Sequence, residues 1–163
     1  MNGIVRSLAF ALLISGFISA CTTQTSRSPV STLTIKAAID SLWTHYAIAS
    51  DQRDAAAFGA LFTEDAALMY SGAPTARGRE AIQTYLASSY SGIDVTGWRV
   101  VPDETRVSGL FAVQGGTFEG SFLQNDKPMT ELGRYTLVAE MQPDHAWKIA
   151  RLTAIVDSTV ATP

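Results

Sequence analysis

The sequence contains few of the groups on which redox and metal chemistry depend. Its 163 residues include one cysteine, Cys21, and two histidines, His45 and His145. A single cysteine cannot form an intramolecular disulfide, so packing must stabilise the fold. No His, Cys, Asp and Glu residues have the spacing of a metal site, and no glycine-rich phosphate loop precedes a helix. We therefore expect neither a metal nor another cofactor.

An excess of positive charge is also missing. The chain has 12 Lys and Arg against 15 Asp and Glu, a formal net charge of −3. Without a basic stripe, nucleic acid is excluded as a partner. The sequence has no basic amphipathic helix either, so we expect no membrane contact through the folded domain itself. Ser-His-Asp hydrolysis is not expected, because no nucleophile elbow is present.

An N-terminal apolar segment that ends at Cys21 is the clearest feature present. Arg6 supplies positive charge, residues 7–17 are apolar or small, and residues 18–21 read Ile-Ser-Ala-Cys. This pattern is typical of a secretory signal peptide, and the apolar run is shorter than the ~20 residues of a membrane span. The last four residues resemble the lipobox of bacterial lipoproteins, in which the cysteine is lipidated. The alternative is an ordinary signal peptide with an accidental thiol near the cut.

The lipobox resemblance implies a location and a domain organisation. Residues 1–20 would be the signal peptide, and the lipid on Cys21 would hold the protein to a membrane. An aspartate in place of Thr22 would mark inner-membrane retention, so the resemblance implies the outer membrane, facing the periplasm. Residues 21–32, rich in Ser and Thr, are expected to be a flexible tether. The folded domain is predicted over residues 33–158, followed by a tail.

Helical periodicity marks the first half of the predicted domain. Apolar residues recur at steps of three or four over residues 34–50, which predicts a helix. Asp54 is a candidate N-cap for a short second helix, and Gly78 opens a third. Residues 66–70 are expected to form a strand between these two helices.

In the second half the apolar period changes to two. Strands are predicted at about residues 94–106, 110–122, 130–142 and 146–157, separated by turn-forming residues. Gly115 and Gly116 suggest a bulge or sharp bend. On the third strand the apolar face expected to pack on the helices contains Tyr135, Leu137, Ala139 and Met141. Helices followed by an antiparallel meander predict an α+β fold.

Two stretches of sequence resemble the nuclear transport factor 2-like superfamily, in its SnoaL-like branch. The matching residues are 51–54, Phe58, 61–66 and 78–82, then 133–137 and 147–150. The resemblance implies a cone in which three N-terminal helices pack on a strongly curved, mainly antiparallel sheet, with a pocket at the wide end. It also implies a homodimer formed through the outer face of the sheet. Function varies widely on this fold, so the resemblance does not fix an activity.

Position by position, the chain departs from members of this fold that resemble ketosteroid isomerase. Their oxyanion-donating tyrosine corresponds to Tyr46, but their base is replaced by Tyr70. Their second acid falls at or beside Leu137, and the tyrosines that support the donor correspond to Phe62 and Leu86. With one polar group left, we expect no isomerase chemistry of that kind. Members that resemble scytalone dehydratase need pocket histidines, whereas both histidines here are expected to be exposed.

Aromatic residues are the remaining candidates for a site. Each alone is readily explained as core, but several buried tyrosines together need hydrogen-bond partners, which a half-wet pocket would supply. The candidate pocket residues are Trp43, Tyr46, Phe62, Tyr70, Tyr85, Trp98, Phe118, Tyr135 and Leu137. The leading hypothesis is a lipid-anchored, non-catalytic domain that binds a small apolar or aromatic molecule. The alternatives are an isomerase-, dehydratase- or cyclase-type enzyme that uses Tyr46 and Tyr70, and a purely structural homo-oligomer.

The lipid anchor can be tested at Cys21. We predict that Cys21→Ser leaves a soluble or uncleaved product, because serine cannot form the thioether on which lipidation depends. Membrane fractionation and mass spectrometry of the extracted protein would report the change. Normal membrane fractionation of the variant would contradict the anchor.

Overall fold

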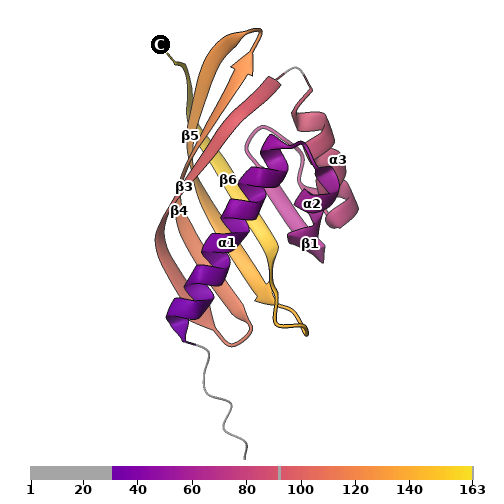
Figure 1. Ribbon diagram of the computed structural model, residues 1–163, viewed down its shortest axis with the longest axis vertical. Coiled ribbons are helices and arrows are strands. Elements are labelled where there is room, and N and C mark those ends of the chain that lie inside the picture. Colours follow the sequence, from indigo (N-terminus) through magenta and orange to yellow (C-terminus); the bar gives the residue numbers. More distant parts are fainter. Residues whose placement is uncertain (1–30, 92, 163) are drawn as a thin grey trace, which may run out of the picture.

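The computed structural model describes residues 31–91 and 93–162, which form three helices and a six-stranded sheet (Figure 1). The predicted signal peptide and Cys21 lie outside these residues. None of the described helices is long and apolar enough to cross a bilayer.

The three predicted helices are present. They are α1 (Thr32–Asp51), α2 (Ala55–Ala60) and α3 (Arg79–Ser89). Ser31 caps α1 by accepting a hydrogen bond from Thr34 N, and the Asp54 side chain accepts from Ala57 N at 2.9 Å, as the predicted N-cap of α2. Gly78 precedes α3 with a φ of 80°, a left-handed conformation that favours glycine.

Six strands form one sheet in the order β2-β1-β6-β5-β4-β3. They are β1 (Phe62–Tyr70), β2 (Ala76–Arg77), β3 (Ile93–Ser108), β4 (Phe111–Gln124), β5 (Lys127–Met141) and β6 (Trp147–Ala161). The β1–β6 pair is parallel, and all the other pairs are antiparallel. This arrangement confirms the α+β fold with a curved, mainly antiparallel sheet.

Three details differ from the predicted elements. β1 begins at Phe62 instead of residue 66, because a register irregularity between Phe62 and Ala67 keeps the polar stretch between them extended beside β6. The short β2 was not predicted. β6 continues to Ala161, because its last residues pair with the start of β5 as far as Met129.

The predicted bulge lies across from the two glycines instead of on them. Pro102 pairs with Gly116 and Glu104 with Gly115, so Asp103 is the extra residue and it belongs to β3. A Cβ atom on Gly116 would lie 2.3 Å from the carbonyl oxygen of Val101. The glycine is therefore needed for the close approach of β3 at its bend.

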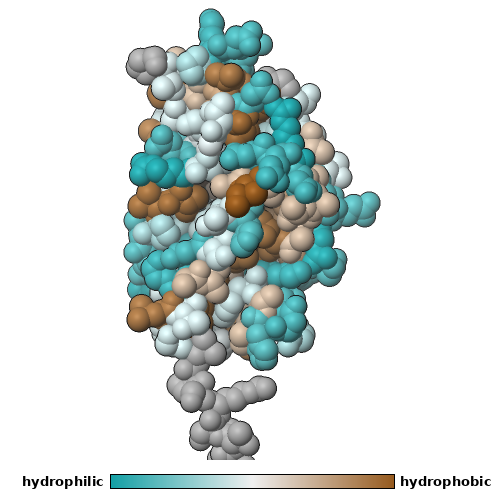
Figure 2. Space-filling view, in the orientation of Figure 1, coloured by the Kyte–Doolittle hydropathy of each residue, from teal (hydrophilic) through white to brown (hydrophobic). Residues whose placement is uncertain are grey.

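The core lies between α1 and the inner face of the sheet, as the two periodicities predict. On β5, Tyr135, Leu137 and Ala139 are buried, whereas Arg134 and Thr136 are exposed. On the face of the molecule seen in Figure 2, hydrophobic residues lie in separate patches among hydrophilic ones. The N-terminal end of α1 lies at one end of the sheet, and its C-terminal end lies beside α2 and α3 (Figure 1).

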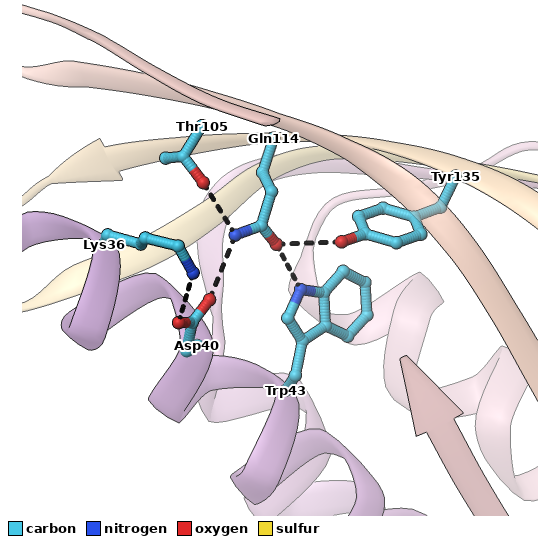
Figure 3. A network of polar contacts seen from close by, with 6 residues as sticks. All are labelled: Lys36, Asp40, Trp43, Thr105, Gln114 and Tyr135. Carbon is cyan, nitrogen blue, oxygen red and sulfur yellow. Dashed lines mark hydrogen bonds and ion pairs between the residues drawn. The ribbon is translucent and has the colours of Figure 1, made fainter. Parts of the chain in front are cut away.

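One buried amide connects α1 to the sheet. Gln114 on β4 is fully buried, and its Oε1 accepts hydrogen bonds from Trp43 Nε1 at 2.7 Å and from the Tyr135 hydroxyl at 2.9 Å (Figure 3). Its Nε2 donates to Thr105 Oγ1 at 3.0 Å and to Asp40 Oδ1 at 3.2 Å. Because an amide offers two donors and two acceptor lone pairs, all of its capacity is used.

Gln114→Leu is expected to destabilise the fold by roughly 2–5 kcal/mol, since each buried polar group left without a partner costs about 1–3 kcal/mol. Urea unfolding of Gln114→Leu, Tyr135→Phe and the double variant would measure both the loss and the coupling. We expect Tyr135→Phe to be less destabilising when Gln114 is already leucine. Equal effects of Tyr135→Phe in the two backgrounds would contradict the network.

Candidate functional site

A cavity of about 300 Å³ opens between the C-terminal half of α1, α3 and the neighbouring ends of β3, β4 and β5. Its lining is mostly apolar and aromatic, with a few hydroxyl groups and one carboxylate. The main side chains in the lining are Tyr46, Phe58, Tyr70, Tyr85, Tyr90, Ile93, Val95, Trp98, Phe122 and Glu131. The volume is at the lower end of the range of small-molecule sites.

Glu131 places the carboxylate in this cavity. It lies on β5 opposite Gly120 of β4, and it accepts a hydrogen bond from the Tyr70 hydroxyl. A Cβ atom on Gly120 would lie 3.0 Å from the Trp98 ring and 3.2 Å from Glu131 Cγ, so the absence of a side chain there makes room for both. Burial raises the pKa of the Glu131 carboxyl, and the hydrogen bond from Tyr70 opposes part of that rise.

The tyrosines around Glu131 stay protonated. Burial is the largest cause that raises the pKa of Tyr46, Tyr70, Tyr85 and Tyr90. The negative charge of Glu131 raises the pKa of Tyr46, Tyr70 and Tyr85 further. At neutral pH the cavity therefore offers neutral phenol groups that can donate hydrogen bonds.

A second, deeper cavity of about 20 Å³ adjoins the first and shares Tyr46, Tyr70 and Trp98 with it. Packed rings enclose it: the centroids of Trp43 and Tyr135 lie 4.6 Å apart. This space has room for about one water molecule. The interior is thus filled with side chains at the Gln114 end and open at the Glu131 end.

The predicted pocket residues divide into three groups. Tyr46, Tyr70, Tyr85 and Trp98 line the large cavity. Trp43, Phe118 and Tyr135 line the small one, away from the large cavity. Phe62 and Leu137 are fully buried in the core and line neither.

Sequence reasoning missed Glu131, Tyr90 and Phe58. In the resemblance to isomerase-like members, the second acid falls at or beside Leu137, which is six residues after Glu131 on β5. The signal for Glu131 was nevertheless present, because it shares the parity of Tyr135 and Leu137 and so belongs to the same inward face. Extending the alternation by two steps would have placed a carboxylate inside the cone.

The two histidines take no part in the site. His45 is exposed on α1, and its Nδ1 lies 2.8 Å from the carbonyl oxygen of Ser41. His145 is exposed in the turn before β6, with a φ of 66°. Within residues 31–91 and 93–162, no group of His, Cys, Asp and Glu could hold a metal ion.

The arrangement has two chemical capacities. The apolar walls and the phenol groups can hold and orient a small molecule. Glu131, with Tyr70 bound to it, can accept a hydrogen bond or a proton, or pair with a positive charge.

Comparison with known proteins identifies the fold. The family model described as SnoaL-like domain matches residues 31–153. No curated protein sequence matches the chain. Among solved structures, a ketosteroid isomerase-like protein from Erwinia carotovora atroseptica SCRI1043 is 20% identical, with a TM-score of 0.67 over 75% of this chain and 95% of that one.

Two further structures have the same fold. A nuclear transport factor 2-like superfamily protein from Salmonella enterica serovar Typhimurium LT2 is 18% identical, with a TM-score of 0.68 over 78% of this chain and 94% of that one. A hexachlorocyclohexane dehydrochlorinase from Novosphingobium barchaimii LL02 is 17% identical, with a TM-score of 0.61 over 80% of this chain and 91% of that one.

The burial of Glu131 predicts a pH-dependent stability. A carboxyl with a folded-state pKa above its unfolded value, near 4.5, contributes stability that is fully present below that value and is lost as pH rises through the folded-state pKa. Urea unfolding between about pH 4 and pH 8 should therefore show the wild type losing stability relative to Glu131→Gln as pH rises. The control is Glu140→Gln, on the opposite face of β5. The same pH-dependent difference in that variant would contradict an origin at Glu131.

Proposed function

The chain belongs to the SnoaL-like domain family, and from this premise we propose that its large cavity binds a small, mostly apolar molecule. The observation that carries the proposal is the cavity itself: about 300 Å³, lined mainly by aromatic and aliphatic side chains with a few polar groups. Small-molecule sites have this composition, in which apolar walls supply affinity and a few polar groups fix orientation.

Tyr46 is the hydroxyl donor that we assign to the ligand. It is buried, it lines the cavity, and its hydroxyl stays protonated because burial raises its pKa. Its ring is held between Phe58, with centroids 4.7 Å apart, and Trp98, with centroids 6.1 Å apart. A ring fixed in this way loses little freedom when the hydroxyl binds a ligand acceptor.

Proton transfer is the second candidate function, and the contact between Glu131 and Tyr70 favours it. A carboxylate that removes a proton from a carbon acid would become a neutral carboxyl, while the Tyr46 hydroxyl could stabilise the negative charge on the substrate oxygen. The dehydrochlorinase among the similar structures gives this candidate a precedent on the fold alone.

Two wider features belong to the same proposal. The lipid on Cys21 would place the domain at the periplasmic face of the outer membrane.

A second copy of the chain would cover the outer face of the sheet. The apolar side chains there are about half exposed, and they are Val101, Phe111, Val113, Leu132 and Ile155. Sedimentation equilibrium of the wild type and Val113→Asp would test the dimer, since a charge buried among these apolar side chains should dissociate it.

Val95→Trp tests whether the cavity binds ligands, because Val95 lines the cavity from β3 and an indole there would fill it. We expect small aromatic compounds detected by saturation-transfer NMR to bind the wild type and to lose binding in Val95→Trp. Tyr46→Phe should weaken aromatic ketones by about 1 kcal/mol, roughly fivefold, and leave aromatic hydrocarbons unchanged.

Binding that survives Val95→Trp, or the absence of binding to the wild type, would contradict the proposed site. The same ketones in D₂O distinguish the second candidate. Accelerated exchange of their α-hydrogens, lost in Glu131→Gln, would indicate proton transfer, and unaccelerated exchange would count against it.

A further inference from the structure

The cavity contains a negative charge that no neighbouring side chain balances. The inference drawn here rests on the proposed function, because it specifies the molecule that this same cavity takes. Glu131 is half-buried in the lining, and no Lys, Arg or His is among the described residues that form the lining. Its polar partner is the neutral hydroxyl of Tyr70.

Most basic side chains of the domain are paired elsewhere. Arg77, Lys127 and Lys148 are in none of the ion pairs between the described residues, and they do not line the cavity. Seven ion pairs are formed within residues 31–91 and 93–162, and none includes Glu131. Arg53 comes to the rim, where its Nη2 donates to the carbonyl oxygen of Ile93 at 3.2 Å. Its charge is already paired with Asp94. A half-buried carboxylate without a counter-ion is costly, so a cation that enters the cavity would relieve this cost.

Aromatic rings surround the carboxylate. The centroids of Tyr70 and Tyr85 lie 6.4 Å apart with their planes at 40°, and those of Tyr46 and Trp98 lie 6.1 Å apart at 89°. The faces of such rings carry negative potential and attract cations, most strongly ammonium groups that have lost their water. The cavity thus combines one carboxylate with several neutral, electron-rich rings.

We propose that the ligand is a small organic monocation, an amine or quaternary ammonium compound with an apolar body. Its charged group lies against Glu131 and the tyrosine rings, and its apolar part contacts the aliphatic wall at Ile93 and Val95. Uncharged molecules of the same shape gain the apolar contacts alone. Anions are disfavoured, because the cavity offers them hydroxyl donors but no positive charge.

Benzyltrimethylammonium and neopentylbenzene test this proposal, because they have the same shape and differ in charge. The first carries a permanent positive charge on nitrogen, which pH does not alter, and the second is neutral. By tryptophan fluorescence or saturation-transfer NMR, we expect the cation to bind the wild type about tenfold more tightly than the hydrocarbon. Glu131→Gln should remove most of this preference and leave neopentylbenzene binding unchanged. The matched control is Glu140→Gln, which removes the same charge from the outward face of β5 and should preserve the preference.

A pH titration of the wild type provides a second measurement that needs no variant. As pH falls and Glu131 becomes protonated, the affinity for the cation should fall while that for neopentylbenzene stays constant. The titratable groups that face Glu131, namely Tyr46, Tyr70 and Tyr85, remain protonated in this range because their pKa values are raised.

The outcomes separate this inference from the proposed function. Equal affinity of the wild type for the two compounds would overturn the monocation. A preference that is undiminished in Glu131→Gln or at low pH would overturn the contact of the charged group with Glu131. Binding of neopentylbenzene would still support an apolar small-molecule site. If neither compound binds, both the monocation and the proposed site fail.

Discussion

The position of α1 on the sheet depends on the buried amide of Gln114. This side chain contacts one helix and two neighbouring strands at once, through Trp43 and Asp40 of α1, Thr105 of β3 and Tyr135 of β5. An amide buried in this way is stable only when all four hydrogen bonds are formed together. The network therefore fixes both the rotation of α1 and its position along the sheet, which hydrophobic packing alone would leave less specific.

Fixing α1 also fixes the site. Tyr46 follows Trp43 by about one helical turn, so the bond from the Trp43 indole to Gln114 determines where the Tyr46 hydroxyl points. The inner face of the sheet carries two polar side chains that differ in how many hydrogen bonds the protein supplies to them. Gln114 is saturated by its neighbours and closes its end of the interior, whereas Glu131 has one protein partner and faces open space. This contrast in hydrogen bonding distinguishes the structural end of the cone from the functional one.

Local chemistry was sufficient to predict most of the fold. Helical periodicity located α1, the Asp54 side chain marked the start of α2, and strict alternation assigned the inward face of β5. The bulge was misplaced because its extra residue, Asp103, lies on β3, and a glycine shows only that its partner strand approaches closely. β2 was missed because a strand of two residues is too short to show an alternation of apolar and polar side chains.

The site was harder to predict for physical reasons. Glu131 obeys the alternation that placed Tyr135 and Leu137, yet a carboxylate inside a cone contradicts the expectation that charges face water. Tyr90 and Phe58 reach the cavity only through the packing of α2 against α1 and of α3 against α2, which no local pattern records. Gln114 was equally hidden, since its four partners lie on three elements besides its own strand.

The direction of α1 determines which side of the domain remains accessible when the chain is held by its leading end. Ser31 lies at the start of the helix, and Tyr46 lies roughly 20 Å further along its axis. The cavity beside Glu131 is lined by residues close to the β4–β5 turn, toward the other end of the sheet, where Ala161 pairs with Met129. A surface that grips the residues before Ser31 would thus hold the domain by the end away from the cavity.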